Sequence, residues 1–219
     1  MLGRQEGVRE DISRWQGQVQ HGGVRVRLVS PVREDDIRQL SLGQEVHISG
    51  NAFTARDEAH LRALEMARRG EGLPFDLERA VIYHCGPIVE REGEGWKVIA
   101  AGPTTSSRMN DLEPELIERF RPGAIIGKGG MSSATAEACR RYCCAYLVFT
   151  GGAAVIAAQG IKKVKGVHWL DLGMPEAVWE LEMEDFGPLI VAIDAQGRSL
   201  YESIGKKVAQ NLDALRRKV

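Results

Sequence analysis

The sequence predicts an α/β fold, in which short apolar strands alternate with amphipathic helices. The strand candidates are apolar runs of five to seven residues, rich in valine, isoleucine and aromatic residues, at 80–85, 145–149 and 188–194. Helical spacing of apolar residues appears between and after them, at 111–120, 132–144 and 202–218. Alternation of this kind is typical of a sheet covered by helices.

Composition places the chain among ordinary globular proteins. It has 219 residues, of which 43% are apolar and 27% charged, with a net charge of −1. This balance argues against a general nucleic-acid binder, which relies on excess basic charge. No apolar run approaches the length of a membrane span, and the N-terminus has no signal-peptide core, so we expect a cytoplasmic protein without a membrane partner.

Two regions differ in composition. Residues 1–22 are polar and glycine-bearing, with Trp15 isolated among them, and predict an N-terminal arm. Residues 23–219 contain no repeat and no linker, so we expect them to form one domain. Its first elements are a strand at 24–28, a short helix at 34–40 and a second strand at 45–49.

The next helix carries the first candidate site residues. Thr54 followed by Asp57 resembles a capping box, which places the helix start here, and Gly70 ends the helix after Arg69. Arg56 falls at this start, where the helix dipole disfavours a cation, so an anionic ligand would explain it. His60 lies one turn further along the same face. A solvated arginine is the alternative explanation.

A second polar loop follows the next pair of strands, which are 80–85 and a predicted buried strand at 96–101, joined by a hairpin around Gly93 and Gly95. The loop, residues 102–109, has four consecutive hydroxyl residues and then an arginine. One helical turn would bring Thr104 and Arg108 together. Ligands of α/β folds bind in loops that follow strands, although a simple Ser/Thr-rich loop remains possible.

The stretch from Gly123 to Met131 is a third candidate site. A strand ends in Gly127-Lys-Gly-Gly130, and a helix follows from Ser132, so backbone N–H groups and a lysine would face one anion. A Walker A loop is excluded, because Gly123 is one residue too close to Gly127 and Gly129 replaces the hydroxyl residue. The GXXG loop of KH RNA-binding domains remains an alternative, and so does a plain turn.

The four cysteines are predicted to be structural. Three of them, Cys139, Cys143 and Cys144, fall on one helix, but adjacent positions point to different sides, and no CxxC pair occurs. We expect these residues and Cys85 to be reduced, buried and without a metal. Beyond them, residues 179–184 alternate strictly between apolar and acidic residues, as a half-buried strand does.

Three of these segments together resemble the β subunit, or C-terminal domain, of the class I iron–sulfur fumarate hydratase and L(+)-tartrate dehydratase family. They are Thr54–His60, Gly102–Met109 and Gly127–Met131, and His84–Pro87 and Gly173–Trp179 fit the same pattern. The resemblance runs in order from about residue 24 to 205. It implies a three-layer β/β/α swivelling domain with a mixed sheet.

The resemblance also implies an activity, a cofactor and a partner. The activity is reversible addition of water to a small dicarboxylate, with fumarate as the first expectation and L(+)-tartrate dehydration as the second. The [4Fe–4S] cluster would be held by an α subunit in an αβ or α2β2 assembly, and this chain would supply no metal ligand. Outside the family, a KH-like RNA-binding module and a non-catalytic dicarboxylate-binding domain are the alternatives.

The family's functional residues match positions in this chain. Arg56 and Arg108 match its substrate-binding arginines, and Lys128 matches its glycine-loop lysine. The resemblance implies that Lys128 and the flanking Gly127 and Gly129 also bind the substrate. Thr104 matches the threonine proposed as the base, with Lys128 assisting catalysis. We expect Asp57, His60 and Thr105 to contact these residues, or to cap the helix, without touching the substrate. Thr105 is adjacent to Thr104, so it is the alternative candidate for the base.

Overall fold

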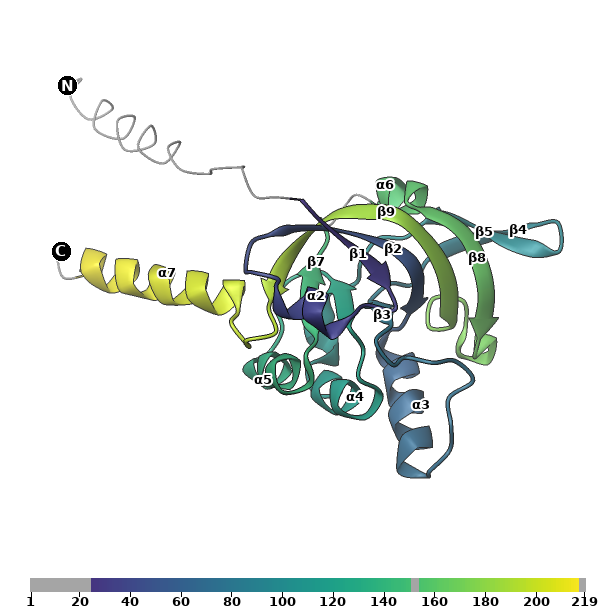
Figure 1. The fold of residues 1–219 in the computed structure, drawn as a ribbon, viewed down its shortest axis with the longest axis horizontal. Helices are drawn as coiled ribbons and strands as arrows, with labels where there is room; N and C mark the ends of the chain where they lie inside the picture. The colour runs from purple at the N-terminus through teal and green to yellow at the C-terminus, as the bar shows by residue number, and fades with distance from the viewer. Residues whose placement is uncertain (1–24, 151–153, 217–219) are drawn as a thin grey trace, which may run out of the picture.

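A computed structural model of the chain describes residues 25–150 and 154–216. The arm predicted at residues 1–22 lies outside this part. The fold is built on a mixed seven-stranded sheet in the order β1-β2-β3-β6-β7-β9-β8 (Figure 1). This confirms the α/β class and the mixed sheet predicted above.

One layer of the sheet is parallel. Its strands, in spatial order, are β2 (Glu45–Thr54), β3 (Val81–Tyr83), β6 (Ala124–Gly127) and β7 (Ala145–Val148). On the other side of β2, β1 (Val26–Ser30) also pairs in parallel. The three central strands β3, β6 and β7 are short and apolar, as expected where both faces of a sheet are covered.

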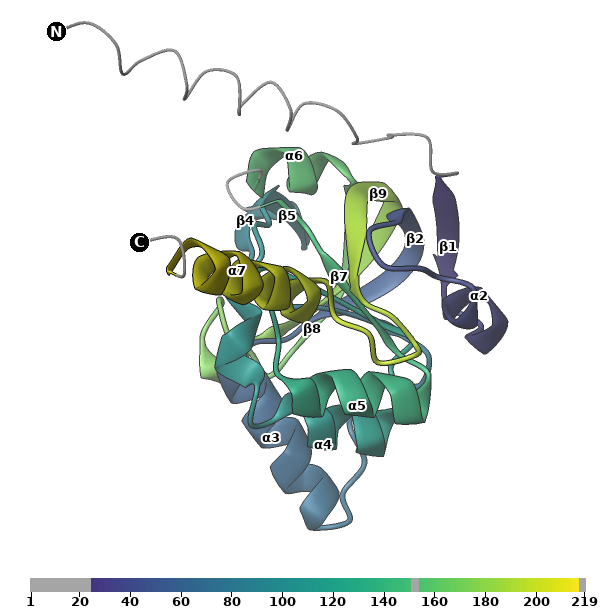
Figure 2. The same cartoon turned by 90° about the vertical axis from the view of Figure 1, so that its left-hand side faces the viewer.

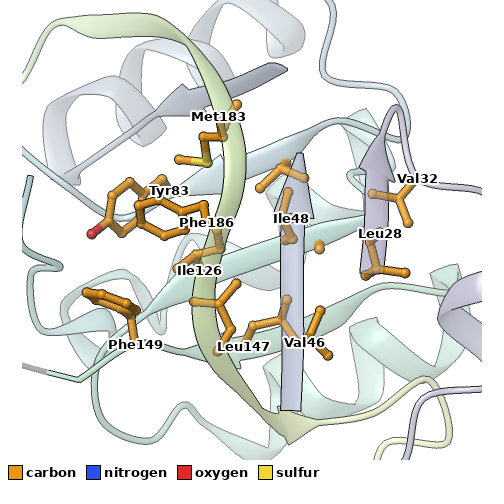
Figure 3. Packing of buried hydrophobic residues seen from close by; sticks show 14 of the residues in the cluster. Leu28, Val32, Val46, Ile48, Tyr83, Ile126, Leu147, Phe149, Met183 and Phe186 are labelled. Carbon is orange, nitrogen blue, oxygen red and sulfur yellow. The ribbon is translucent and has the colours of Figure 1, made fainter. Parts of the chain in front are cut away.

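A second layer folds over the first. The long strand β9 (Val178–Ile193) runs antiparallel to β7 at one end and to β2 along most of its length. It therefore closes β2, β3, β6, β7 and β9 into a ring, and β8 (Ile161–His168) pairs with the outer edge of β9. The interior of this ring is one apolar cluster, to which Ile48, Ile126 and Phe186 contribute (Figure 3).

The third layer consists of helices on the outer face of the parallel strands. They are α3 (Asp57–Arg68), α4 (Glu113–Phe120) and α5 (Ser133–Tyr142), which lie together on one side of the sheet (Figure 2). A second apolar cluster fills the space between them and the sheet, with Ile82, Ile125 and Tyr146 from the strands. The order β/β/α agrees with the predicted layers.

The start of α3 differs from the prediction. Strand β2 continues through Gly50 to Thr54, so the capping box predicted for Thr54 is wrong. The buried Thr54 hydroxyl instead bridges to β9, donating to the Ala177 carbonyl and accepting from the Trp179 N–H. Arg56 is the N-cap residue, in extended conformation, and its own side chain makes no capping hydrogen bond.

Two other strand predictions are corrected. Residues 95–100 do not pair with β3, because β5 (Gly95–Ala100) forms a separate hairpin with β4 (Ile88–Glu92), and its residues are half-buried or exposed. Residues 178–193 form one continuous strand rather than two. The burial of Trp179, Leu181 and Met183 along it follows the predicted alternation.

The remaining elements connect or flank the layers. They are α2 (Glu34–Arg38), the 3-10 helices η1 (Ser106–Met109) and η2 (Leu170–Leu172), α6 (Ala154–Gln159) and α7 (Leu200–Arg216). Helix α7 projects from the body (Figure 1), and its apolar residues Ile204, Val208 and Leu212 are exposed. None of the described helices is long and apolar enough to cross a membrane.

Candidate active site

The predicted site residues follow three adjacent parallel strands. Arg56 comes two residues after β2, His84 directly follows β3, and Lys128 directly follows β6. Because β2, β3 and β6 are neighbours, their carboxyl ends meet at one edge of the sheet, where α/β folds bind ligands. Loops that are far apart in the sequence are thereby brought together.

Arg56 is held between two carboxylates. Its Nη2 lies 3.1 Å from Glu176 Oε1 and 4.0 Å from Asp57 Oδ2, and about a fifth of its side chain is exposed. Its Nε is buried without a hydrogen-bond partner. The guanidinium is therefore held in place by Glu176, and the exposed fifth of the side chain is the part that an anionic ligand could reach.

Gly86 allows two segments to meet at Arg56. A Cβ at Gly86 would lie 2.6 Å from the Pro175 carbonyl oxygen and 2.9 Å from Arg56 Nη1. The next residue after Pro175 is Glu176, which also accepts a hydrogen bond from the Glu58 N–H at 3.1 Å. The two motifs that contain Gly86 and Glu176 thus form one support for Arg56.

The 3-10 helix η1 places Arg108 beside the start of α3. Arg108 Nε donates to Asp57 Oδ1 at 3.0 Å, and roughly half of the arginine side chain is exposed. Since this contact uses Nε, the two Nη groups are the donors that a ligand carboxylate could reach. Thr104 is half-buried and Thr105 is exposed, and the Thr104 N–H donates to the His84 carbonyl at 2.7 Å.

The glycine loop is joined to the hydroxyl loop by two hydrogen bonds between Lys128 and Ser106. The Ser106 N–H donates to the Lys128 carbonyl, and the Ser106 hydroxyl accepts from the Lys128 N–H, both at 3.1 Å. A Cβ at Gly127 would lie only 1.9 Å from Ser106 Oγ, and Gly129 has φ +78°, so both positions favour glycine. Lys128 itself is half-buried.

A fully buried cluster of His60, His84 and Glu113 lies beneath these loops. The Nε2 atoms of His84 and His60 lie 2.9 and 3.3 Å from Glu113 Oε2, which are ion-pair distances without the alignment of hydrogen bonds. Burial alone would raise the pKa of Glu113, but the two imidazoles lower it to about 2. Burial lowers the pKa of His60, and Glu113 outweighs that effect and raises it.

Comparison with known proteins places these loops in a known family. The chain matches the family model described as "Fumarase C-terminus" over residues 4–204. The chain belongs to the Fumarase C-terminus family. The glycine loop, for which a KH loop was an alternative, lies inside the matched region.

Relatives in this family carry two kinds of name. The "Putative L(+)-tartrate dehydratase subunit beta" of Methanocaldococcus jannaschii is 48% identical over 82% of this chain and 93% of its own length. The "L(+)-tartrate dehydratase subunit beta" of Escherichia coli K12 is 37% identical over 86% and 92%. The "Putative fumarate hydratase class I" of Geobacillus stearothermophilus is 37% identical over 89% of this chain and 37% of its own length.

The cysteines of this chain do not fit as ligands of the iron–sulfur cluster that the sequence resemblance implies. All four are buried and free, as predicted; Cys85 lies two residues after β3, close to the candidate site, but its side chain is fully buried in the core. Burial raises the pKa of the Cys85 thiol to about 12 and that of Cys144 well above its usual value. Cluster ligands are thiolates, which these environments disfavour.

The residues predicted from the sequence lie at the surface of the candidate site, whereas the residues that support them were not predicted. His84 and Glu176 were noted only as parts of motifs, Ser106 only as one hydroxyl of four, and Glu113 not at all. Their roles come from contacts between distant segments. His84 offered one usable signal, because it is a polar residue directly after a buried strand.

Proposed function

We propose that this chain is the β subunit of a two-subunit hydro-lyase that reversibly adds water to a small dicarboxylate. The observation that carries the proposal is the convergence of Arg56, Arg108 and Lys128 with Thr104 at the carboxyl ends of β2, β3 and β6. Membership of the Fumarase C-terminus family supports it. The cytoplasm is the proposed location.

The cations bind the two substrate carboxylates. Arg108 offers its Nη groups to one carboxylate, and Arg56, anchored by Glu176, offers its remaining N–H donors to the other. The Lys128 ammonium and the glycine loop contribute further positive charge. Fixed cations on three separate loops would orient a short dianion without needing a deep apolar pocket.

Thr104 acts as the base at the substrate carbon. In dehydration, its deprotonated oxygen takes the proton from the carbon next to a carboxylate as the hydroxyl group departs from the neighbouring carbon. In hydration, the threonine hydroxyl returns that proton to the carbon. The threonine oxygen is a weak base at neutral pH, so nearby cations and a proton acceptor from the partner would have to favour its deprotonated form.

The partner is an α subunit that holds a [4Fe–4S] cluster. The buried thiols of this chain are consistent with ligation elsewhere. The site lies at a sheet edge where Arg108 is half exposed, so a second subunit could complete it. No step assigned to this chain requires a metal ligand from it.

We propose fumarate or L(+)-tartrate as the substrate, with fumarate as the first expectation. The names of the Methanocaldococcus and Escherichia relatives, which align over nearly their whole length, support tartrate, and the name of the Geobacillus relative supports fumarate. Both compounds place two carboxylates a few bonds apart, so the same cations could bind either. The difference would lie in contacts to the additional hydroxyl group of tartrate.

The test is anaerobic purification of the tagged chain from its own cells, with iron and sulfide analysis, native mass measurement and assays on both substrates. We expect an equimolar iron-containing partner and turnover of one substrate, which Arg56→Ala abolishes and Arg33→Ala, at an exposed ion pair with Asp36, does not. Recovery of the chain alone, dicarboxylate binding without turnover, or recovery with RNA would each overturn the proposal. The mass distinguishes αβ from α2β2.

A further inference from the structure

The buried cluster of His60, His84 and Glu113 is not required by the fold alone. All three side chains are completely buried, at the junction of α3, the end of β3 and the start of α4. A buried ion pair contributes little net stability, because desolvation offsets the attraction, and apolar residues of similar size would pack at lower cost. The contacts of the two histidines indicate another role.

The first histidine is connected to the segment that carries Arg56. His60 Nδ1 lies 2.8 Å from the Arg56 carbonyl oxygen, and since a carbonyl only accepts, Nδ1 carries the proton. The Nε2 atom on the other side of the ring faces Glu113. The imidazole thus connects the N-cap residue of α3 to the buried carboxylate.

The second histidine is connected to the other two loops. His84 Nδ1 lies 2.9 Å from Ser106 Oγ, and that oxygen accepts from the Lys128 N–H at 3.1 Å. The carbonyl of His84 accepts from the Thr104 N–H at 2.7 Å. Glu113 is therefore linked, through two imidazoles and one hydroxyl, to the backbone beside each of Arg56, Thr104 and Lys128.

We propose that Glu113 is a positioning residue that fixes the three site loops relative to one another through His60 and His84. This inference rests on the proposed function, in which the three loops bind the substrate. A buried carboxylate is displaced only at high cost, so groups bound to it are held rigidly. Such rigidity keeps reacting groups in productive geometry before the substrate binds.

The test compares Glu113→Gln with Glu115→Gln in the full chain. Glu115 lies two residues along the same helix but pairs with Arg68 and Arg119 near the surface. We expect Glu113→Gln to speed hydrogen exchange of the Thr104, Ser106 and Lys128 amides about tenfold or more, with β7 unchanged. In the complex, KM should rise and kcat fall together, whereas loss of folded protein would lower the apparent kcat alone.

A second variant keeps the proposal testable if Glu113→Gln does not fold. Ser106→Ala leaves the cluster intact and removes its link to the glycine loop, so we expect faster exchange at Lys128 but not at the α3 start. The proposal would be overturned if hydrogen exchange of the loop amides were unchanged in both variants. An unchanged KM in the complex that contains Glu113→Gln would also overturn it.

Metal analysis supplies a separate outcome. Among the described residues, His60, His84 and Glu113 are also a set whose ligand atoms could converge on a metal ion. One equivalent of zinc in the purified chain, lost in Glu113→Gln, would overturn the ion-pair role. Faster loop exchange in a chain whose complex hydrates no dicarboxylate would support the positioning role and refute only the proposed function.

Discussion

Asp57 Oδ1 accepts a hydrogen bond from Arg108 Nε at 3.0 Å, across 51 residues of sequence. The contact joins the first residue of α3 to the 3-10 helix η1. It orients one proposed substrate-binding arginine next to another, since Arg56 precedes Asp57 in the chain. Asp57 thereby decides where the free Nη groups of Arg108 lie.

Removing this carboxylate should weaken substrate binding. We expect Asp57→Ala to lower kcat/KM about tenfold, roughly the effect of losing one charge-assisted hydrogen bond, mainly through KM. Asp57→Asn should retain most of the activity, because its amide oxygen can still accept from Nε. Steady-state kinetics of the complex would measure both.

The matched control is Asp171→Ala. Asp171 forms a two-point contact with Arg62 at 2.7 and 2.9 Å, but away from the three site loops. Its loss should leave kinetics unchanged. Equal damage by Asp57→Asn and Asp57→Ala would show that charge, rather than orientation of Arg108, is what matters.

The two threonines of the hydroxyl loop should differ in their effect on turnover. We expect Thr104→Ala to lower kcat by about a hundredfold or more with little change in KM, as for loss of a general base. Thr105→Ala should change kcat only a few-fold, and Arg108→Ala should damage both parameters. Single-turnover kinetics on the complex would separate chemistry from binding, and near-normal kcat for Thr104→Ala would refute its role.

The parts of the fold that could be predicted from sequence are those with local signals. The glycine loop, α5 and β7 follow from adjacent residues, because a buried parallel strand is short and apolar and a helix shows its period. The capping box predicted at Thr54 does not form, because the Thr54 hydroxyl makes hydrogen bonds with the distant residues Ala177 and Trp179 instead. The Trp179 N–H on β9 donates to the Thr54 hydroxyl, and the residues next to Thr54 in the sequence give no indication of this contact.

The candidate site likewise contains residues that have a local sequence signal and residues that do not. Arg56 and Lys128 have such a signal. A cation is unfavourable at the start of a helix, and a lysine among glycines is typical of an anion site, so both positions suggest a ligand. Glu113 does not, because an acidic residue in the first turn of a helix is common and is normally exposed. Its burial depends on His60 and His84 arriving from two other elements.

The thiols should be unreactive in the folded protein. Burial raises the pKa of Cys85 to about 12, so at pH 7–8 almost none of it is thiolate, the form that reacts. We expect negligible labelling of all four cysteines by a thiol-specific reagent until denaturant is added. Mass spectrometry of the labelled chain would count the modified thiols, and fast modification of Cys85 in native buffer would contradict its burial.

Gly86→Ala tests whether close backbone approach at Arg56 matters. The added methyl group would lie 2.6 Å from the Pro175 carbonyl, which is backbone and cannot simply rotate away, and 2.9 Å from Arg56 Nη1. We expect a loss of about 1–3 kcal/mol in the free energy of unfolding, together with a raised KM, because both the Arg56 side chain and its Glu176 support must move. Gly72→Ala is the control, since nothing lies within 4 Å of its Cβ position and its φ is not positive. Denaturant titration and steady-state kinetics would measure the two effects, and wild-type values in Gly86→Ala would show that the Arg56 side chain does not depend on this approach.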